Sequence, residues 1–149
     1  MDIQTIKALL DACYQAKRIR DLLPALPEGG TPSYIHYLDT IETLEGQGAQ
    51  VKVSDISDAL NIPRPGVTRT VKEMEARGSL CKRTSPPDGR VTCLSITEAG
   101  RELSRRYNDV YFRRLAPFLQ DISREEADCT IRTIQRFYQV MSERSISVE

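Results

Sequence analysis

The middle of the chain carries two short helix patterns and a hairpin pattern in immediate succession, and this order constrains the fold most. Residues 55–61 and 64–77 place apolar side chains at helical spacing, and the turn IPRP joins them. Strand-like residues 79–84 and 91–96 follow, separated by SPPDGR, whose Pro, Asp and Gly favour a hairpin loop. A short extended piece, Gln50 to Val53, precedes the first of these helices, and residues 50–96 are therefore predicted to form one compact unit.

Longer helix patterns flank this unit on both sides. Apolar residues recur at three- and four-residue spacing over 3–23, 34–44, 98–117 and 127–141. The sequence predicts a mainly α protein with one small β-hairpin, and the long helices must bury their apolar stripes somewhere.

Hydroxyl side chains mark three of the expected helix starts. Ser54 and Thr97 are expected to act as N-caps for the helices that follow them. Ser123 with Glu126 three residues later has the spacing of a capping box.

The net charge is zero over 149 residues, but the charges are unevenly distributed. Residues 61–106 hold ten Lys or Arg against five Asp or Glu, whereas residues 1–60 hold five against nine. Residues 107–149 are nearly balanced, with six against seven. A basic middle segment between acidic flanks predicts a surface for a polyanion.

The helix expected over 64–77 separates its apolar side chains from its basic ones. One side carries the apolar residues Val67, Val71 and Met74. At 100° per residue, Arg69 and Lys72 point the opposite way, with Thr68 on the flank. Such a face suits a DNA major groove, where Arg and Lys reach phosphates or guanine edges. Taken alone, the helix also fits an ordinary solvated surface.

The hairpin is also basic. Lys82 and Arg83 lead into it, and Arg90 leaves its tip. Asp88 is expected to pair with Arg90, and Gly89 supplies the positive φ that a tight turn favours. A basic hairpin directly after a helix–turn–helix indicates a winged helix, whose tip follows the DNA backbone or enters a minor groove.

Three stretches resemble the MarR-type family of bacterial transcriptional regulators: SDISDALNI, VTRTVKEMEARGSLCKR and DGRVTCLSITEAG. The resemblance runs through the whole chain and is tightest over 54–100. It implies a winged helix–turn–helix plus a helical dimerisation domain. The implied domains are an N-terminal dimerisation helix with a connecting helix over 1–48, the DNA-binding domain over 49–97, and C-terminal dimerisation helices over 98–149.

The resemblance further implies a homodimer that binds double-stranded, palindromic operator DNA, and a repressor is expected. The expected DNA-binding residues are Ser54, Arg64, Thr68, Arg69, Lys72, Arg83, Asp88, Gly89 and Arg90. The expected dimer-interface residues are Leu10, Tyr107, Val110, Ile131, Ile134, Tyr138 and Met141. The sequence departs from the family pattern at Pro63, where a capping Ser or Thr is usual, and at Gly89, where a second arginine is common.

Members of this family release DNA when a small phenolic or anionic effector binds between the two domains, or when an N-terminal cysteine is oxidised. The resemblance makes Cys13, Tyr34 and Tyr37 the candidate ligand or redox residues. The alternative function is therefore a thiol-based organic hydroperoxide sensor, or a peroxidatic thiol protein, that uses Cys13. Cys13 also fits a purely structural role as a small apolar residue of its helix stripe.

Several function classes lack support in the sequence. A single histidine, His36, and four scattered cysteines without a CxxC pair predict no metal site and no cofactor. No readable set of nucleophile, base or paired acids indicates an enzyme. No apolar run approaches the roughly 18 residues of a membrane span, so a cytoplasmic protein is expected. A winged helix that binds only proteins is the third alternative, and outward-facing Arg69 and Lys72 argue against it.

Overall fold

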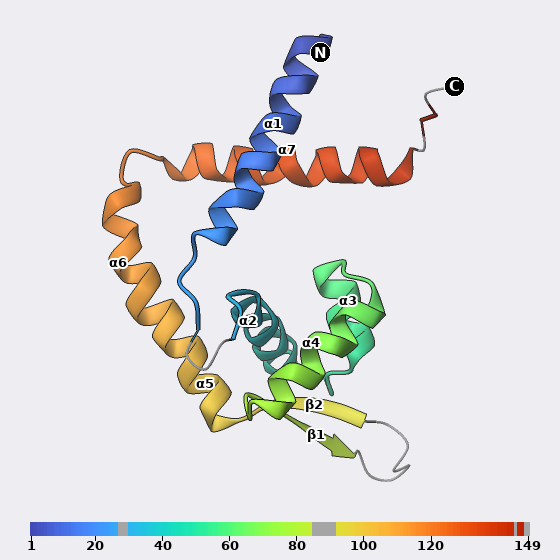
Figure 1. Ribbon diagram of the computed structural model, residues 1–149, viewed down its shortest axis with the longest axis vertical. Coiled ribbons are helices and arrows are strands. Elements are labelled where there is room, and N and C mark those ends of the chain that lie inside the picture. Colours follow the sequence, from blue (N-terminus) through green and yellow to red (C-terminus); the bar gives the residue numbers. More distant parts are fainter. Residues whose placement is uncertain (27–29, 85–91, 145, 148–149) are drawn as a thin grey trace. The chain divides into compact units, whose positions relative to one another are not determined.

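The computed structural model describes residues 1–26, 30–84, 92–144 and 146–147 (Figure 1). The chain divides into two compact units: unit 1 comprises residues 1–22 and 114–149, and unit 2 comprises residues 23–113. The described residues are mostly helical and include one two-stranded hairpin, which confirms the predicted fold class.

Unit 2 contains most of the secondary structure elements. Its helices are α2 (Ser33–Gly46), α3 (Val53–Leu60), α4 (Arg64–Ala76) and α5 (Glu98–Arg105). Its strands are β1 (Leu80–Thr84) and β2 (Thr92–Ile96). A π-helical segment, Arg106–Phe112, continues α5. The predicted order of two short helices followed by a hairpin is therefore confirmed.

The two strands pair in antiparallel register, from Leu80 opposite Ile96 to Thr84 opposite Thr92. The extended piece expected after Gln50 forms no third strand among the described residues. It instead contributes one backbone hydrogen bond, in which the Leu94 N–H donates to the Val51 carbonyl at 2.7 Å. This bond attaches β2 to the start of the helix–turn–helix.

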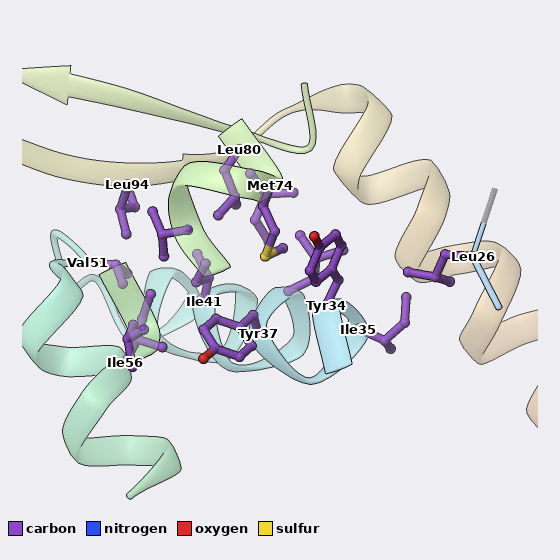
Figure 2. Close-up of a cluster of buried hydrophobic side chains, with 14 of the residues drawn as sticks. Leu26, Tyr34, Ile35, Tyr37, Ile41, Val51, Ile56, Met74, Leu80 and Leu94 are labelled. Atoms are coloured by element: carbon purple, nitrogen blue, oxygen red, sulfur yellow. The ribbon is translucent and has the colours of Figure 1, made fainter. Parts of the chain in front are cut away.

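The hydrophobic core of unit 2 is organised around α2 (Figure 2). Helix α2 contributes five buried side chains: Tyr34, Ile35, Tyr37, Leu38 and Ile41. Figure 2 shows the labelled side chains extending from Val51, Ile56 and Leu94 at one end to Leu26 at the other. Helix α4 and both strands pack onto the same cluster through Met74, Leu80 and Leu94. One core therefore holds the helix–turn–helix and the hairpin together.

The helix caps predicted at Thr97 and Ser123 are confirmed. The Thr97 hydroxyl accepts from the Gly100 N–H at 3.1 Å, and Ser123 and Glu126 form the expected capping box. The prediction for Ser54 is wrong, because α3 begins at Val53, two residues before the predicted start. There the Asp55 carboxylate accepts from the Lys52 N–H at 2.7 Å. This carboxylate satisfies a backbone donor at the helix start, so the Ser54 hydroxyl is not needed.

The start of α5 lies directly against the turn that follows α4. The Thr97 N–H donates to the Ser79 carbonyl at 3.2 Å. A Cβ atom added at Gly100 would collide with the Ser79 carbonyl oxygen and would lie 2.9 Å from the Ile96 side chain. Glycine at this position therefore permits the close approach of α5 to the α4–β1 turn.

The single helix expected over 98–117 is interrupted, because i→i+5 bonding replaces α-helical bonding from Arg106 to Phe112. The apolar pattern placed Val110 on the same stripe as Tyr107. In the structure Val110 is exposed, and Tyr111 packs against the core beside Tyr107, with ring centroids 5.2 Å apart. The longer hydrogen-bonded turn places residue 111, rather than residue 110, on the inner side.

Unit 1 contains α1 (Ile3–Asp21) and α7 (Arg124–Glu143), with a 3₁₀ turn, Ala116–Leu119, before α7. The short helix α6 (Arg113–Leu115) begins at the last residue of unit 2. None of the described residues of α1 or α7 is buried. Within the described part of the chain, no helix combines the length and apolarity that crossing a bilayer requires.

Candidate nucleic-acid interface

The turn between α3 and α4 sets the orientation of α4. Asn61 ends α3 in the left-handed conformation at φ 53°, and the Ser57 hydroxyl donates to the Ile62 carbonyl at 2.6 Å. Pro63 precedes α4 without a side-chain cap, and Pro65 lies in its first turn, where proline is tolerated. This departure from a Ser or Thr cap therefore still gives a helix that begins at Arg64.

The predicted inner face of α4 is confirmed. Its three apolar residues, Val67, Val71 and Met74, are at most 1% exposed. Arg64, Thr68, Arg69 and Lys72 are all exposed, and together with Pro65 and Glu73 they line one shallow open hollow. We call Arg64, Thr68, Arg69 and Lys72 the α4 polar face.

The acidic side chains of α4 are bonded to partners on other elements. Glu73 accepts a hydrogen bond from the Tyr34 hydroxyl at 2.9 Å, and Glu75 pairs with Lys82 of β1 at 2.6 Å. Among the described residues, Arg64, Arg69 and Lys72 form no ion pair. Their positive charge is therefore available to a polyanion.

The other expected DNA-binding residues lie in three different settings. Ser54 is half-buried in the first turn of α3, and its hydroxyl lies 3.4 Å from the Asp55 carboxylate. Arg83 is exposed on β1, opposite Cys93 of β2. The remaining three, Asp88, Gly89 and Arg90, lie outside the described residues.

The candidate ligand or redox residues are distributed over both units. Tyr34 and Tyr37 are buried in the core of unit 2, whereas Cys13 is half-buried on α1 of unit 1. All four cysteines are free. Within unit 1, Cys13 and Cys129 both line an apolar hollow of about 480 Å³ formed by residues of α1 and α7.

The expected dimer-interface residues are mostly exposed. Leu10 on α1 is 47% exposed, and the four residues on α7 are between 39% and 59% exposed: Ile131, Ile134, Tyr138 and Met141. Tyr107 lies in the core of unit 2, where its hydroxyl donates to the Pro24 carbonyl at 2.8 Å.

Sequence reasoning missed a cavity of about 220 Å³ inside unit 2. Its lining includes the residues Leu26, Gly30, Tyr34, Arg77, Ser79, Ala99, Glu102, Leu103 and Arg106. Burial raises the pKa of Tyr34 above its usual value, and the neighbouring Glu73 raises it further while Arg77 opposes the shift. The two arginines belong to different elements, so no local sequence pattern could have indicated that they line one cavity.

Taken together, the helix–turn–helix, the basic strand and the α4 polar face define the winged helix–turn–helix class. Residues 29–91 match the family model for the MarR family, which confirms the resemblance of this sequence to the MarR-type winged helix–turn–helix regulators.

The uncharacterized HTH-type transcriptional regulator YdgJ of Bacillus subtilis (strain 168) is 30% identical over 94 residues, which are 63% of this chain and 57% of that protein. The match thus spans just over half the length of that relative.

Solved structures of other proteins share the fold. A MarR/EmrR family transcriptional regulator from Acinetobacter sp. ADP1 has a TM-score of 0.68 at 19% identity, covering 97% of this chain and all of that one. Streptococcus pneumoniae FabT in complex with DNA has a TM-score of 0.63 at 21% identity, covering 95% and 99%.

Proposed function

We propose that the chain is a homodimeric MarR-type transcriptional regulator that binds palindromic operator DNA and acts as a repressor. In this proposal α4 enters the major groove, and the basic hairpin contacts the DNA beside it. The observation that carries the proposal is the α4 polar face, whose cations form no ion pair among the described residues. The FabT structure, which shares this fold, was solved in complex with DNA.

Salt dependence is the direct test of DNA binding. Fluorescence anisotropy with a duplex from the region upstream of the chain's own gene should show affinity that falls steeply and linearly on a log–log plot against salt. A DNase footprint on the same region should reveal an inverted repeat whose half-site centres lie about 34 Å apart. Absence of duplex binding at low salt would refute the proposal.

The homodimer part of the proposal is supported by unit 1. Its two long helices present large apolar side chains to solvent, among them Ile6 and Leu10 on α1 and Ile131 and Tyr138 on α7. Contiguous exposed apolar surface marks an interaction site in a soluble protein. A second copy of the chain would cover these faces and would also supply the second recognition helix for a palindrome.

The unit 2 cavity supports release by a small anionic effector. Leu26 and Leu103 offer apolar contacts, and Arg77 and Arg106 supply positive charge. A volume of about 220 Å³ suits a single aromatic ring with one carboxylate or phenolate. Such a ligand would compete with Glu102, which pairs with Arg106 at 2.9 Å.

Benzoate is a suitable probe for this site. We expect benzoate to weaken DNA binding by the wild-type protein and to have less effect on Arg106→Gln. The matched control is Arg105→Gln, because Arg105 also pairs with Glu102, at 2.7 Å, but does not line the cavity. Equal responses of both variants would exclude the cavity as the effector site.

Thiol sensing is the second candidate function, favoured by the shared hollow of Cys13 and Cys129. An organic hydroperoxide would transfer one oxygen to the Cys13 thiolate, giving a sulfenic acid and the corresponding alcohol. Cumene hydroperoxide should then weaken DNA binding of the wild type and leave Cys13→Ser unaffected. Identical responses of the two proteins would exclude this function.

A further inference from the structure

The hydrogen bond between Tyr34 and Glu73 links the core helix α2 to the candidate recognition helix α4. Tyr34 is 3% exposed, and its hydroxyl donates to the Glu73 Oε2 atom at 2.9 Å across 39 positions of sequence. The two residues line different hollows. Tyr34 lines the unit 2 cavity, and Glu73 lines the hollow on α4. The bond therefore lies between the interior of unit 2 and the α4 polar face.

Among the residues that the structure describes, Glu73 is the one carboxylate that lines the same hollow as the α4 polar face. It lies one helical turn after Arg69, and side chains four positions apart on a helix are neighbours. A Glu73 carboxylate without a partner could therefore pair with Arg69 or project toward a phosphate. Either arrangement would oppose the binding of a polyanion, because it neutralises a cation or places like charges together.

The Tyr34 ring is well placed to prevent this. A Cβ atom added at Gly30 would lie 3.3 Å from the Tyr34 ring, so the chain packs closely against that ring. Burial and Glu73 together raise the pKa of Tyr34, so its hydroxyl remains a protonated donor at neutral pH. Arg77 also interacts with the Tyr34 hydroxyl, which adds positive charge on the side toward which Glu73 is held.

We propose that Tyr34 is a positioning residue for DNA recognition, whose hydroxyl holds the Glu73 carboxylate toward the interior and so keeps Arg69 available to DNA. This inference rests on the proposed DNA-binding function. It assigns Tyr34 an effect on DNA affinity without any contact with DNA.

A double-mutant cycle tests the proposal with four proteins: wild type, Tyr34→Phe, Glu73→Gln and the double variant. Each is titrated against the same upstream duplex by fluorescence anisotropy at three salt concentrations. Tyr34→Phe should weaken binding about threefold to tenfold and flatten the salt slope, because roughly one phosphate contact is lost. Glu73→Gln should bind at least as tightly as wild type. The double variant should recover the affinity of Glu73→Gln to within about twofold, because no carboxylate remains to be released.

Two results would overturn the inference while leaving DNA binding itself intact. Tyr34→Phe could bind as tightly as wild type, or its loss could persist undiminished in the Glu73→Gln background. A structural defect alone would give the second result, since removing the Glu73 charge cannot repair a damaged core. If the wild type binds no duplex at all, the proposed function fails and this inference falls with it.

Tyr111→Phe is the matched control for loss of a tyrosine hydroxyl in unit 2. The Tyr111 hydroxyl makes no hydrogen bond to another described residue, and its ring packs at the edge of the core. Thermal melting of all five proteins separates folding from binding. Should Tyr34→Phe prove unfolded, Tyr34→Met, which also removes the hydroxyl donor, replaces it in the cycle. Retention of wild-type affinity by Tyr111→Phe is expected, and a loss equal to that of Tyr34→Phe would overturn the specific role of Tyr34.

Discussion

Two residues five positions apart on α4 have different roles: one stabilises the fold, and the other is available to DNA. Substituting each should therefore affect either stability or DNA binding, but not both. Met74 is fully buried, whereas Arg69 is exposed on the α4 polar face. Met74→Ala should lower the free energy of unfolding by about 2–5 kcal/mol, through lost apolar contact and a residual cavity. Arg69→Ala should leave the melting temperature unchanged and weaken specific DNA binding by about 1–3 kcal/mol if the guanidinium makes a bidentate base contact.

Thermal melts beside operator titrations check this pair of variants. A drop in melting temperature for Arg69→Ala as large as that for Met74→Ala, with DNA binding retained, would contradict the division between the two faces. Lys72→Ala serves as a second test of the same face, because Lys72 is also exposed and forms no ion pair among the described residues.

Two buried tyrosines make the stability of unit 2 sensitive to alkaline pH. Burial raises the pKa of both Tyr34 and Tyr107 above 10.0, so the folded state favours their neutral forms. Their contribution is fully present below pH 10 and is lost as the pH rises through the raised pKa values of the folded state.

Melting temperatures between pH 8 and pH 11 measure this effect. The wild type should lose stability more steeply above pH 10 than Tyr34→Phe or Tyr107→Phe does, since each variant lacks one ionisable phenol. Parallel curves for the three proteins would show that these phenols do not control alkaline unfolding.

At the scale of elements, the contact between α5 and the α4–β1 turn depends on the absence of a side chain at Gly100. Gly100→Ala would place a Cβ atom against the Ser79 carbonyl, which cannot move without disturbing its bond from Thr97. We expect a loss of about 1–3 kcal/mol in unfolding free energy by urea denaturation. The control is Gly46→Ala, because nothing lies within 4 Å of a Cβ atom there. A Gly100→Ala protein as stable as the control would refute this packing argument.

Element patterns in the sequence predicted what depends on local periodicity. The inner face of α4 and the hairpin strands follow from apolar spacing and turn residues, and the caps at Thr97 and Ser123 follow from hydroxyl chemistry at the helix start. Ser54 was predicted wrongly because α3 begins at Val53, so that Ser54 lies inside the first turn, and the Asp55 carboxylate accepts from the Lys52 N–H. Sequence alone offers no rule for which of two adjacent polar side chains prevails.

Long-range pairings could not be predicted in this way. The bond from Tyr34 to Glu73 joins residues on different helices, and its existence depends on how α2 packs against α4. The π-helical turns also could not be read from an α-helical pattern, which placed Val110 on one stripe with Tyr107, whereas in the structure Tyr111 packs against the core beside Tyr107. In both cases tertiary packing decides between local alternatives of similar energy.

At the scale of the whole molecule, apolar burial is confined to unit 2. The described residues of unit 1 include no buried side chain, although α1 and α7 carry large apolar residues such as Leu10 and Ile131. We expect sedimentation at micromolar concentration to give a particle of twice the chain mass of 16.9 kDa. A monomer under these conditions would contradict the proposed homodimer.

Replacing Ile131 and Tyr138 together by Ser should shift that particle toward the monomer. The variant should keep the melting behaviour of unit 2, because neither residue belongs to its core. Loss of operator affinity should accompany dissociation, since one recognition helix alone reads half of a palindrome.

Because the described residues of unit 1 form no buried core, the stability of unit 1 should depend on protein concentration. A segment whose apolar side chains are covered only by association is stabilised in proportion to the logarithm of the partner's concentration. Dilution should therefore lower the melting midpoint of α1 and α7 while the midpoint of unit 2 stays fixed, so that one transition at high concentration separates into two at low concentration. In a cell, the abundance of the protein would then determine how much of the chain is folded as well as how much DNA is occupied.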